Sequence, residues 1–427
     1  DVAAFPDVAR KSVRLRVEVG NATGKPGSGV LAAGGKKVSV RWAEPGGTFE
    51  VEVDLGPEAG TWDEFDPALQ RVEVRLEGEG GIEDSRTATF GLREIVSAGR
   101  DFLLNGRKTF FRGTLECAIF PKTGHPPTDV ASWKRIVRIA KAHGLNSIRF
   151  HSWCPPEAAF TAADEEGFYY QVEVASWANS STRLGAGLPI DEWLYRETDR
   201  ILKAYGNHPS FLLLPYGNEP AGRDAEFLGR WVEHWKALDP RRLYTSASGW
   251  PQIPENQFHV APDPRIQAWG QGLASRVNAK PPETRTDYRD YVRARPVPVV
   301  SHEIGQWCAY PNPAERSKYT GYLKARNLDI FADTLAASGM ADQAAEFVSV
   351  WPPNRLLDPL RPETRLLLRR LASTARASWI NSSGMLSWNR SPMSAMTHIG
   401  RAPGPRLNGT PLGSTLIRAS RRSFSTS

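Results

Sequence analysis

Two patterns of hydrophobic and polar positions divide this chain. Between residues 10 and 95, apolar side chains recur at every second position, and Gly, Pro, Asn and Asp separate the runs, which cover 13–19, 38–42, 49–55 and 72–76. A period of two is that of a strand with one buried face, and several short strands of this kind are typical of a β-sandwich. Residues 1–97 are therefore predicted to form an immunoglobulin-like β-sandwich domain, with Asp63, Glu64 and Asp66 in a solvated turn.

From about residue 100, apolar runs alternate with segments of helical periodicity. The first helix is expected after Thr128 or Asp129 as N-cap, with Gly144 as its stop. Further helices are expected at 158–165, 191–205 and 225–237, and strands at 110–113, 147–150, 168–172, 211–214, 243–247, 258–260 and 297–300. Such alternation predicts a parallel sheet with crossover helices, and seven strands favour a (β/α)8 TIM barrel over residues 98–350.

Two glutamates stand just beyond predicted strands. Glu219 follows the fourth strand and Glu303 the seventh. In a barrel the C-terminal ends of the strands build the active site, so both carboxylates are expected at one mouth. A retaining glycosidase needs such a pair about 5 to 5.5 Å apart, one group as acid and the other as nucleophile. Asn218-Glu219-Pro220 alone is more typical of a surface turn than of a catalytic site, so the pairing with Glu303 carries the interpretation.

Two neighbours give these glutamates distinct roles. Asn218 is expected to hydrogen-bond a sugar hydroxyl beside the bond that is cleaved. Arg149, at the end of the second strand, is expected to hold Glu303 ionised, because a nearby cation favours a charged carboxylate. The alternative for Arg149 is a structural ion pair, since a buried arginine is usually paired in either case.

The chain resembles the clan A glycoside hydrolases, in particular glycoside hydrolase family 2, over residues 10–348. Besides Asn218-Glu219-Pro220 and Glu303-Ile304-Gly305, the resemblance rests on Trp62-Asp63-Glu64-Phe65-Asp66-Pro67, Phe90-Gly91-Leu92-Arg93-Glu94, Leu104-Asn105-Gly106, Arg112-Gly113, Asn146-Ser147-Ile148-Arg149 and Asp164-Glu165-Glu166-Gly167. It implies that Glu219 is the general acid/base and Glu303 the nucleophile, with Arg149 and Asn218 in the sugar pocket. The expected activity is that of a retaining exo-β-glycosidase of β-galactosidase, β-mannosidase or β-glucuronidase type. The alternative is a catalytically inactive carbohydrate-binding barrel protein.

The remaining candidates have weaker signals. Glu116 stands after the first strand, where many members of the family carry a His, and His151 follows the second strand. Trp153, Trp269 and Trp307 could each form a sugar platform, although aromatic residues more often fill a core. His259 or Trp269 occupies the region in which the family places a Tyr beside its nucleophile. The histidines and carboxylates show no metal-ligand spacing, and no cofactor is expected.

Charge and composition narrow the partners. Residues 351–427 contain 12 Arg, no Lys and two acidic residues, a net of +10, which leaves 42 basic and 45 acidic residues before them. The mildly acidic body argues against a nucleic-acid partner, so a carbohydrate is the expected one. No run approaches 18 apolar residues, so no membrane span is predicted. The three cysteines lack CxxC spacing and are expected to be small buried residues, although a Cys117–Cys154 disulfide stays open.

The two ends of the chain depart from the family. Asp1 stands where an initiator Met would, and the family's leading sugar-binding domain does not precede it, so we expect a cut end. The family resemblance implies a periplasmic or extracellular location. Residues 351–427 are rich in Arg and Ser, and no eighth strand is recognisable in them. This tail is interpreted as a segment translated out of frame, with a disordered basic extension that binds polyanions as the alternative.

Overall fold

The computed structural model describes residues 1–179, 181–262, 287–304 and 312–343. The predictions for Trp269, Trp307, Cys308, an eighth strand and the 351–427 tail fall outside these residues. Among the described residues, no helix is long and apolar enough to cross a membrane.

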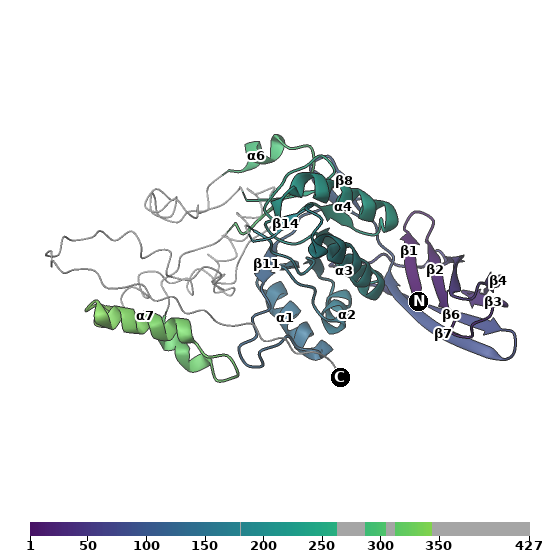
Figure 1. The fold of residues 1–427 in the computed structure, drawn as a ribbon, viewed down its shortest axis with the longest axis horizontal. Coiled ribbons are helices and arrows are strands. Elements are labelled where there is room, and N and C mark those ends of the chain that lie inside the picture. Colours follow the sequence, from purple (N-terminus) through teal and green to yellow (C-terminus); the bar gives the residue numbers. More distant parts are fainter. Residues whose placement is uncertain (180, 263–286, 305–311, 344–427) are drawn as a thin grey trace, which may run out of the picture. The chain divides into compact units, whose positions relative to one another are not determined.

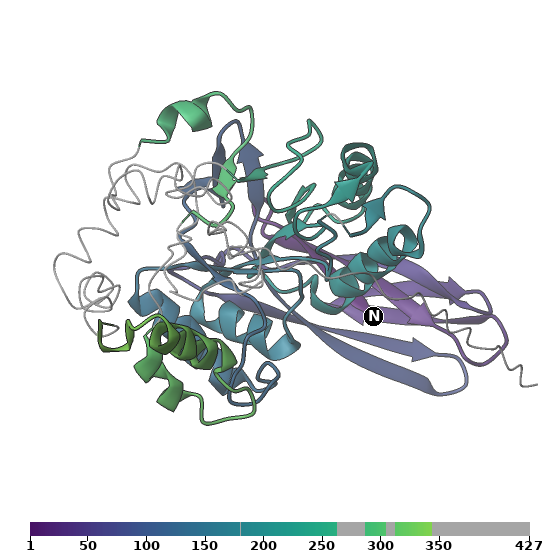
Figure 2. The same cartoon turned by 60° about the vertical axis from the view of Figure 1, so that its left-hand side comes forward.

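The N-terminal strands form two antiparallel sheets (Figure 1). One contains β1 (Val2–Asp7), β2 (Ser12–Gly20) and β5 (Gly46–Asp54), in that order. The other has the order β4 (Lys36–Trp42), β3 (Gly27–Ala33), β6 (Leu69–Gly78) and β7 (Ile82–Gly91). Alternate residues of both sheets, such as Val13, Leu15, Leu31 and Val74, share one buried cluster, as the period of two requires. Strands β6 and β7 form the long hairpin that Figure 2 shows.

A small antiparallel sheet follows the two N-terminal sheets. It consists of β8 (Ile95–Ala98), β9 (Asp101–Leu104) and β10 (Arg107–Thr109). The turn between β9 and β10 places Asn105 in the left-handed region, at φ 52°. Its side chain accepts from the Glu94 amide and donates to the Trp62 carbonyl, so this turn is fixed to the strands before it.

The rest of the described chain is built on parallel strands. One sheet has the order β11 (Gly113–Glu116), β12 (Ser147–Phe150), β13 (Tyr169–Val172), β15 (Phe211–Pro215) and β17 (Leu243–Thr245). β18 (His259–Ala261) pairs in parallel with β19 (Val299–Ser301), and a parallel bridge from Ser248 to Val260 connects this pair to the strand before it. Short strands β14 (Arg183–Leu184) and β16 (Ala221–Gly222) also pair. Seven parallel strands thus follow in chain order, and closure into an eight-stranded barrel stays a prediction.

Five helices of the described residues lie between these strands in the sequence: α1 (Val130–Ala142), α2 (Glu157–Glu166), α3 (Pro189–Tyr205), α4 (Asp224–Leu238) and α6 (Arg289–Arg293). Figure 1 shows α1 to α4 around the strands that begin at β11. The 3-10 turn η2 (Pro313–Lys318), helix α7 (Arg326–Ala337) and the 3-10 turn η3 (Ala341–Gln343) follow β19. Asp129 is the N-cap of α1 and accepts from the Ser132 amide at 2.8 Å. The predicted cap is therefore confirmed in its Asp129 form.

Two sequence predictions are wrong in this region. The first parallel strand covers Gly113–Glu116 rather than 110–113, because the Asn146 side chain, rather than a neighbouring strand, pairs the Arg112 amide and the Phe110 carbonyl. The predicted solvated turn is also largely buried at two positions, since the side chains of Asp63 and Glu64 are only 14% and 13% exposed. Glu64 accepts from Asn146, and its own amide donates to the Tyr169 hydroxyl.

Candidate active site

The two candidate glutamates lie where parallel strands end. Glu219 follows β15 and Glu303 follows β19. Both adopt left-handed backbone conformations, with φ of 37° and 61°. Such angles are uncommon for residues other than glycine, and strained positions of this kind cluster at functional sites. Five other described residues besides glycine also have positive φ, so the angle supports these two positions without singling them out: Lys11, Asn105, Ala118, Ser152 and Asn179.

Arg149, in β12, connects the groups around these glutamates. Its Nε donates to Glu173 Oε1 at 2.6 Å, and its Nη2 donates to Asn218 Oδ1 at 2.7 Å. Its Nη1 lies 3.7 Å from Glu303 Oε1. The side chain is 3% exposed. Arg149 therefore combines both roles that the sequence left open: it forms a buried ion pair with Glu173 and it faces Glu303.

Glu173 was missed by the sequence interpretation. It is fully buried directly after β13, and besides Arg149 it accepts from the Ser152 amide at 2.7 Å and from the Ser248 hydroxyl. Burial would raise the pKa of Glu173, but the Arg149 cation outweighs burial and the pKa lies below its usual value. The signal was available, because Glu173 follows an apolar run as directly as Glu219 does.

Within the described ranges, the side-chain amide of Asn218 has hydrogen-bond partners at its oxygen but none at its nitrogen. Its Oδ1 accepts from Arg149 and from His302 Nε2, the latter at 2.9 Å, while its Nδ2 is buried with no hydrogen-bond partner among the described residues. A buried amide donor without a partner is costly, and it suits a position that a ligand oxygen occupies. The hydrogen bond from Asn218 to a sugar hydroxyl stays a prediction.

Two side chains from the loop after β13 hold the Glu219 carboxylate. Trp177 Nε1 donates to Glu219 Oε2 at 3.0 Å, and Asn179 Nδ2 donates to the same oxygen at 3.1 Å. The Asn179 amide also donates to the Glu219 carbonyl at 2.6 Å. Neither residue was predicted, because this loop has no periodic pattern that would indicate its neighbours.

The Glu303 carboxylate has polar groups on several sides. Its side chain is 7% exposed, and its Oε1 lies 3.8 Å from His151 Nε2 and 3.6 Å from His302 Nε2. Burial, with the Arg149 cation, lowers the pKa of His151 to about 4. His151 is therefore neutral near pH 7, and Arg149 is the permanent cation beside Glu303.

Glu116 has a local role in this structure. Its carboxylate accepts from the amides of Ala118 and Ile119, at 2.9 and 3.2 Å, which fixes the turn after β11. Burial raises the pKa of Glu116. Trp153 packs edge-on against Phe120 and Phe150, which is the packing role rather than the platform role. Cys117 and Cys154 are free thiols, so the disulfide that stayed open is not formed.

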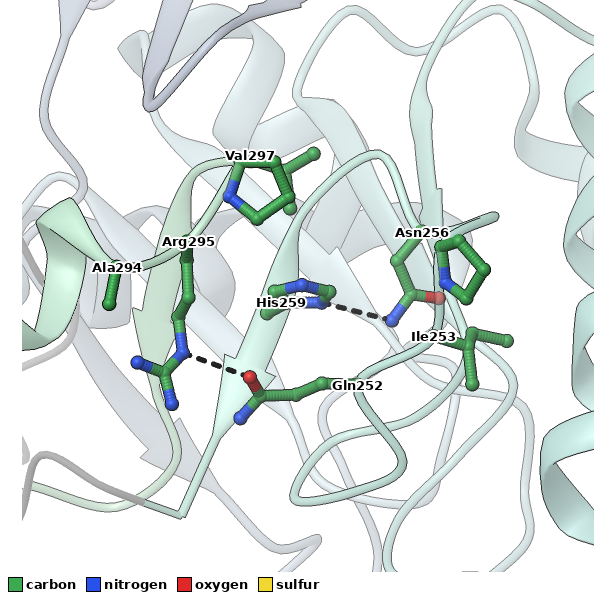
Figure 3. Close-up of a pocket in the computed structure, with 9 residues that line it drawn as sticks. Gln252, Ile253, Asn256, His259, Ala294, Arg295 and Val297 are labelled. Carbon is green, nitrogen blue, oxygen red and sulfur yellow. Dashed lines mark hydrogen bonds between the residues drawn. The ribbon is translucent and has the colours of Figure 1, made fainter.

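A hollow of about 400 Å³ lies elsewhere, between the loop after β17 and the segment before β19 (Figure 3). Gln252, Asn256, His259 and Arg295 supply its polar lining. The side-chain amide of Asn256 donates to His259 Nδ1 at 3.2 Å. Burial and the nearby Arg295 cation lower the pKa of His259 to about 4. Neither candidate glutamate lines this hollow.

No protein-family profile matches the chain, but several curated proteins do. A putative β-glucuronidase of Formosa agariphila is 26% identical over 247 residues, or 57% of this chain and 22% of that protein. A β-galactosidase of an Arthrobacter species is 25% identical over 202 residues, or 46% of this chain and 19% of that protein. A solved family 2 β-galacturonidase of Eisenbergiella tayi, bound to galacturonate, shares 22% identity over 57% of this chain and 45% of its own, with a TM-score of 0.48.

The chain is related to curated proteins named β-glucuronidase and β-galactosidase, as the resemblance to family 2 predicted. It spans about a fifth of the length of these two proteins. Its own activity and the roles of its glutamates are therefore matters of proposal.

Proposed function

We propose that the chain is a retaining exo-β-glycosidase that removes terminal β-linked sugars from oligo- or polysaccharides. In this proposal Glu219 is the general acid/base and Glu303 the nucleophile. Support comes from the relatives named β-glucuronidase and β-galactosidase. It comes also from the position of both carboxylates after parallel strands.

One observation carries the proposal: a buried network approaches Glu303 and includes Asn218, the residue directly before Glu219. Asn218 precedes Glu219 in the chain and accepts from Arg149 and His302. Arg149 and His302 both approach Glu303 Oε1, at 3.7 and 3.6 Å. The unpaired Asn218 amide would then donate to a sugar hydroxyl beside the anomeric carbon, and such bonds strengthen in the transition state.

In the first step, the protonated Glu219 gives its proton to the glycosidic oxygen while the bond from that oxygen to the anomeric carbon breaks. The Glu303 carboxylate attacks the same carbon and forms a glycosyl ester. The indole of Trp177 and the amide of Asn179 both donate to Glu219 Oε2. An oxygen that accepts two such bonds is a poor site for the proton, so Oε1 is the oxygen that carries it.

In the second step, the Glu219 carboxylate removes a proton from water, and the water oxygen attacks the anomeric carbon as the ester bond to Glu303 breaks. The ion pair of Arg149 with Glu173 is neutral as a unit, at 2.6 Å. Glu303 then contributes the negative charge that faces the positive charge developing on the sugar ring. Preorganised charge of this kind is a major source of catalysis in a buried site.

The test is covalent labelling of the full chain. Nitrophenyl β-glucuronide, β-galacturonide, β-galactoside, β-mannoside and β-glucosaminide identify the sugar, and the matching 2-deoxy-2-fluoro glycosyl fluoride should then attach to Glu303, as read by peptide mass. Proton NMR should show the β-anomer as the first product. A first product of α configuration, or a label on another residue, contradicts the mechanism. A Glu303→Gln variant with full turnover would do the same.

A further inference from the structure

We propose that Trp177 and Trp250 form a binding subsite for the leaving group, and that this subsite takes a pyranose ring. The inference rests on the proposed function, because it needs Glu219 to be the group that protonates the leaving oxygen. It adds the residues that would hold the sugar beyond the cleaved bond, and it predicts a preference for such saccharides over small alkyl or aryl glycosides.

These two indoles differ from the other tryptophans of the described chain. They are 36% and 38% exposed, whereas those in the core, such as Trp62, Trp133 and Trp231, are fully buried. Tryptophan is highly buried on average, so an exposed indole needs a reason. The exposed part of each ring is accessible to a ligand.

Hydrogen bonds hold both indoles beside the acid/base. Trp177 Nε1 donates to Glu219 Oε2, and Trp250 Nε1 donates to the carbonyl of Pro220, the next residue, both at 3.0 Å. Trp177 also packs edge-on against His151, with ring centroids 5.0 Å apart. Each ring therefore has its polar atom occupied and an apolar face left for another group.

The backbone of three loops fixes these positions. Parallel bridges join Trp177 to Asn218 and Asn218 to Ser248. The Glu219 amide donates to the Ser248 carbonyl at 3.0 Å. Gly249, at φ 109°, approaches Glu219 so closely that an added Cβ would lie 3.3 Å from the Glu219 Cγ. The two tryptophans thus belong to neighbouring loops on either side of the Glu219 loop, and little ordering is left for a ligand to impose.

The exposed faces of the Trp177 and Trp250 rings favour a particular class of ligand. A pyranose has an apolar C–H face and a rim of hydroxyls, so it stacks on an indole while its hydroxyls stay in water or bond the rim. Glu219 protonates the oxygen that leaves with the aglycone, so the ring attached to that oxygen must lie on the Glu219 side. In the part of the chain that the structure describes, Trp177 and Trp250 donate hydrogen bonds to the Glu219-Pro220 segment and so stand on that side.

The kinetic test compares two substrates with the same glycone: a β-linked disaccharide and a glycosyl fluoride, whose leaving group has no ring. Trp250→Ala should lower the kcat/KM for the disaccharide, divided by that for the glycosyl fluoride, about tenfold. A loss of about 1.4 kcal/mol of stacking corresponds to a tenfold loss of affinity. Trp250→Phe, which keeps a ring without the N–H, should retain most of the ratio. Phe65→Ala removes another exposed aromatic residue, 74% exposed, from the N-terminal turn and should leave the ratio unchanged.

An unchanged ratio in Trp250→Ala overturns the subsite. An equal loss of the ratio in Trp250→Phe also overturns it, because the effect would then belong to the hydrogen bond with Pro220.

A second measurement is independent of turnover. In the full chain labelled with 5-fluorotryptophan, methyl β-D-galactopyranoside and methyl β-D-glucopyranoside should shift the fluorine resonances of Trp177 and Trp250 saturably, but not that of Trp193. Shifts without any turnover contradict the proposed hydrolysis and support the subsite. Turnover without shifts supports the proposed hydrolysis and contradicts the subsite.

Discussion

A single guanidinium group ties together side chains from three parallel strands. Arg149, in β12, donates to Glu173 after β13 and to Asn218 after β15, and it faces Glu303 after β19. The three nitrogens of arginine lie in one rigid plane, so each contact fixes the direction of the other two. A lysine carries the same charge but has a single nitrogen to offer.

We therefore expect Arg149→Lys to lower kcat on the preferred nitrophenyl β-glycoside by about 10² to 10³-fold, the range for removing a preorganised donor. KM should change much less, because the network acts on the reacting groups. Arg196→Lys, at an exposed arginine of α3, is the matched control and should be neutral. A rise in KM with kcat unchanged would mean that Arg149 only assists binding.

The buried partner of that arginine should matter for stability. Glu173→Gln leaves the Arg149 cation without its carboxylate, and breaking a buried pair costs about 3 to 5 kcal/mol. The pKa of Glu173 is lowered in the folded chain, although burial opposes this, because Arg149 stabilises the anion. This stability is present above the unfolded pKa, near 4.5, and is lost as the pH falls through the folded pKa.

Urea unfolding of wild type and Glu173→Gln at pH 7 and at pH 4 measures this effect. The difference in unfolding free energy should be large at pH 7 and smaller at pH 4. Glu192→Gln, at a 76% exposed position on α3, should show no difference at either pH. A Glu173→Gln chain as stable as wild type would show that the pair contributes nothing net to folding.

Among single residues, the hydrophobic pattern predicts those that come directly after a strand and misses those that lie in a loop. Glu219 and Glu303 were identified because an apolar run ends just before each. Trp177 and Asn179 hold Glu219 from a loop whose residues have no repeating pattern. Their contact spans about forty positions along the chain, and only the three-dimensional fold brings the two loops together.

Strand boundaries show the same limit at the scale of elements. β12 matched its predicted range because all four of its residues are buried and polar residues bound it. β7 was not predicted because its first six residues are exposed, so the strand is defined by pairing with β6 rather than by burial. A hydrophobic pattern reveals which side chains of a strand are buried, but it does not reveal a strand that is defined only by backbone hydrogen bonds to its neighbour.

The pairing of α2 with the segment before β15 gives a prediction about pH. His208 lies 2.6 Å from Asp164 and 3.6 Å from Glu157, both on α2. Burial would lower the pKa of His208, but Asp164 raises it to about 9. Because the folded pKa is raised, the stability is complete below the unfolded pKa of about 6.5 and is lost as the pH rises through about 9.

We expect His208→Gln to reduce the unfolding free energy by about 1 to 3 kcal/mol at pH 6 and by less at pH 10, as measured by urea unfolding. His234→Gln, at an exposed position on α4, is the control and should be neutral at both pH values. An equal loss at pH 6 and pH 10 would show that packing, not charge, is what His208 contributes.

At the scale of the molecule, the turn before β8 connects the antiparallel strands to the parallel ones. Trp62 is fully buried, and its Nε1 donates to the Asp164 carbonyl of α2 at 2.9 Å. Glu64 accepts from Asn146, which precedes β12. Adjacent charged residues usually lie on the solvent-exposed surface. Here Glu64 is part of a contact with Asn146 that the sequence pattern could not reveal.

Arg93, just after β7, makes another of these connections. It is 5% exposed, and its guanidinium donates to the carbonyls of Pro209, Phe211 and Arg241. Arg93→Met keeps much of the side-chain volume but leaves three carbonyls without their donors, which should cost about 2 to 4 kcal/mol. Because these bonds join residues before β8 to residues around β15 and β17, their loss should also separate the unfolding of the two sets of strands.

Calorimetry of the full chain should therefore show one transition in wild type and two in Arg93→Met, with hydrogen exchange faster first at the amides of β6 and β7. Arg86→Met removes an exposed arginine from β7 and should leave a single transition. If Arg93→Met still unfolds in one transition at the wild-type temperature, the coupling must reside in the apolar contacts around Trp62. Trp62→Phe, which keeps a ring but removes the bond to α2, would then be the variant that splits the transition.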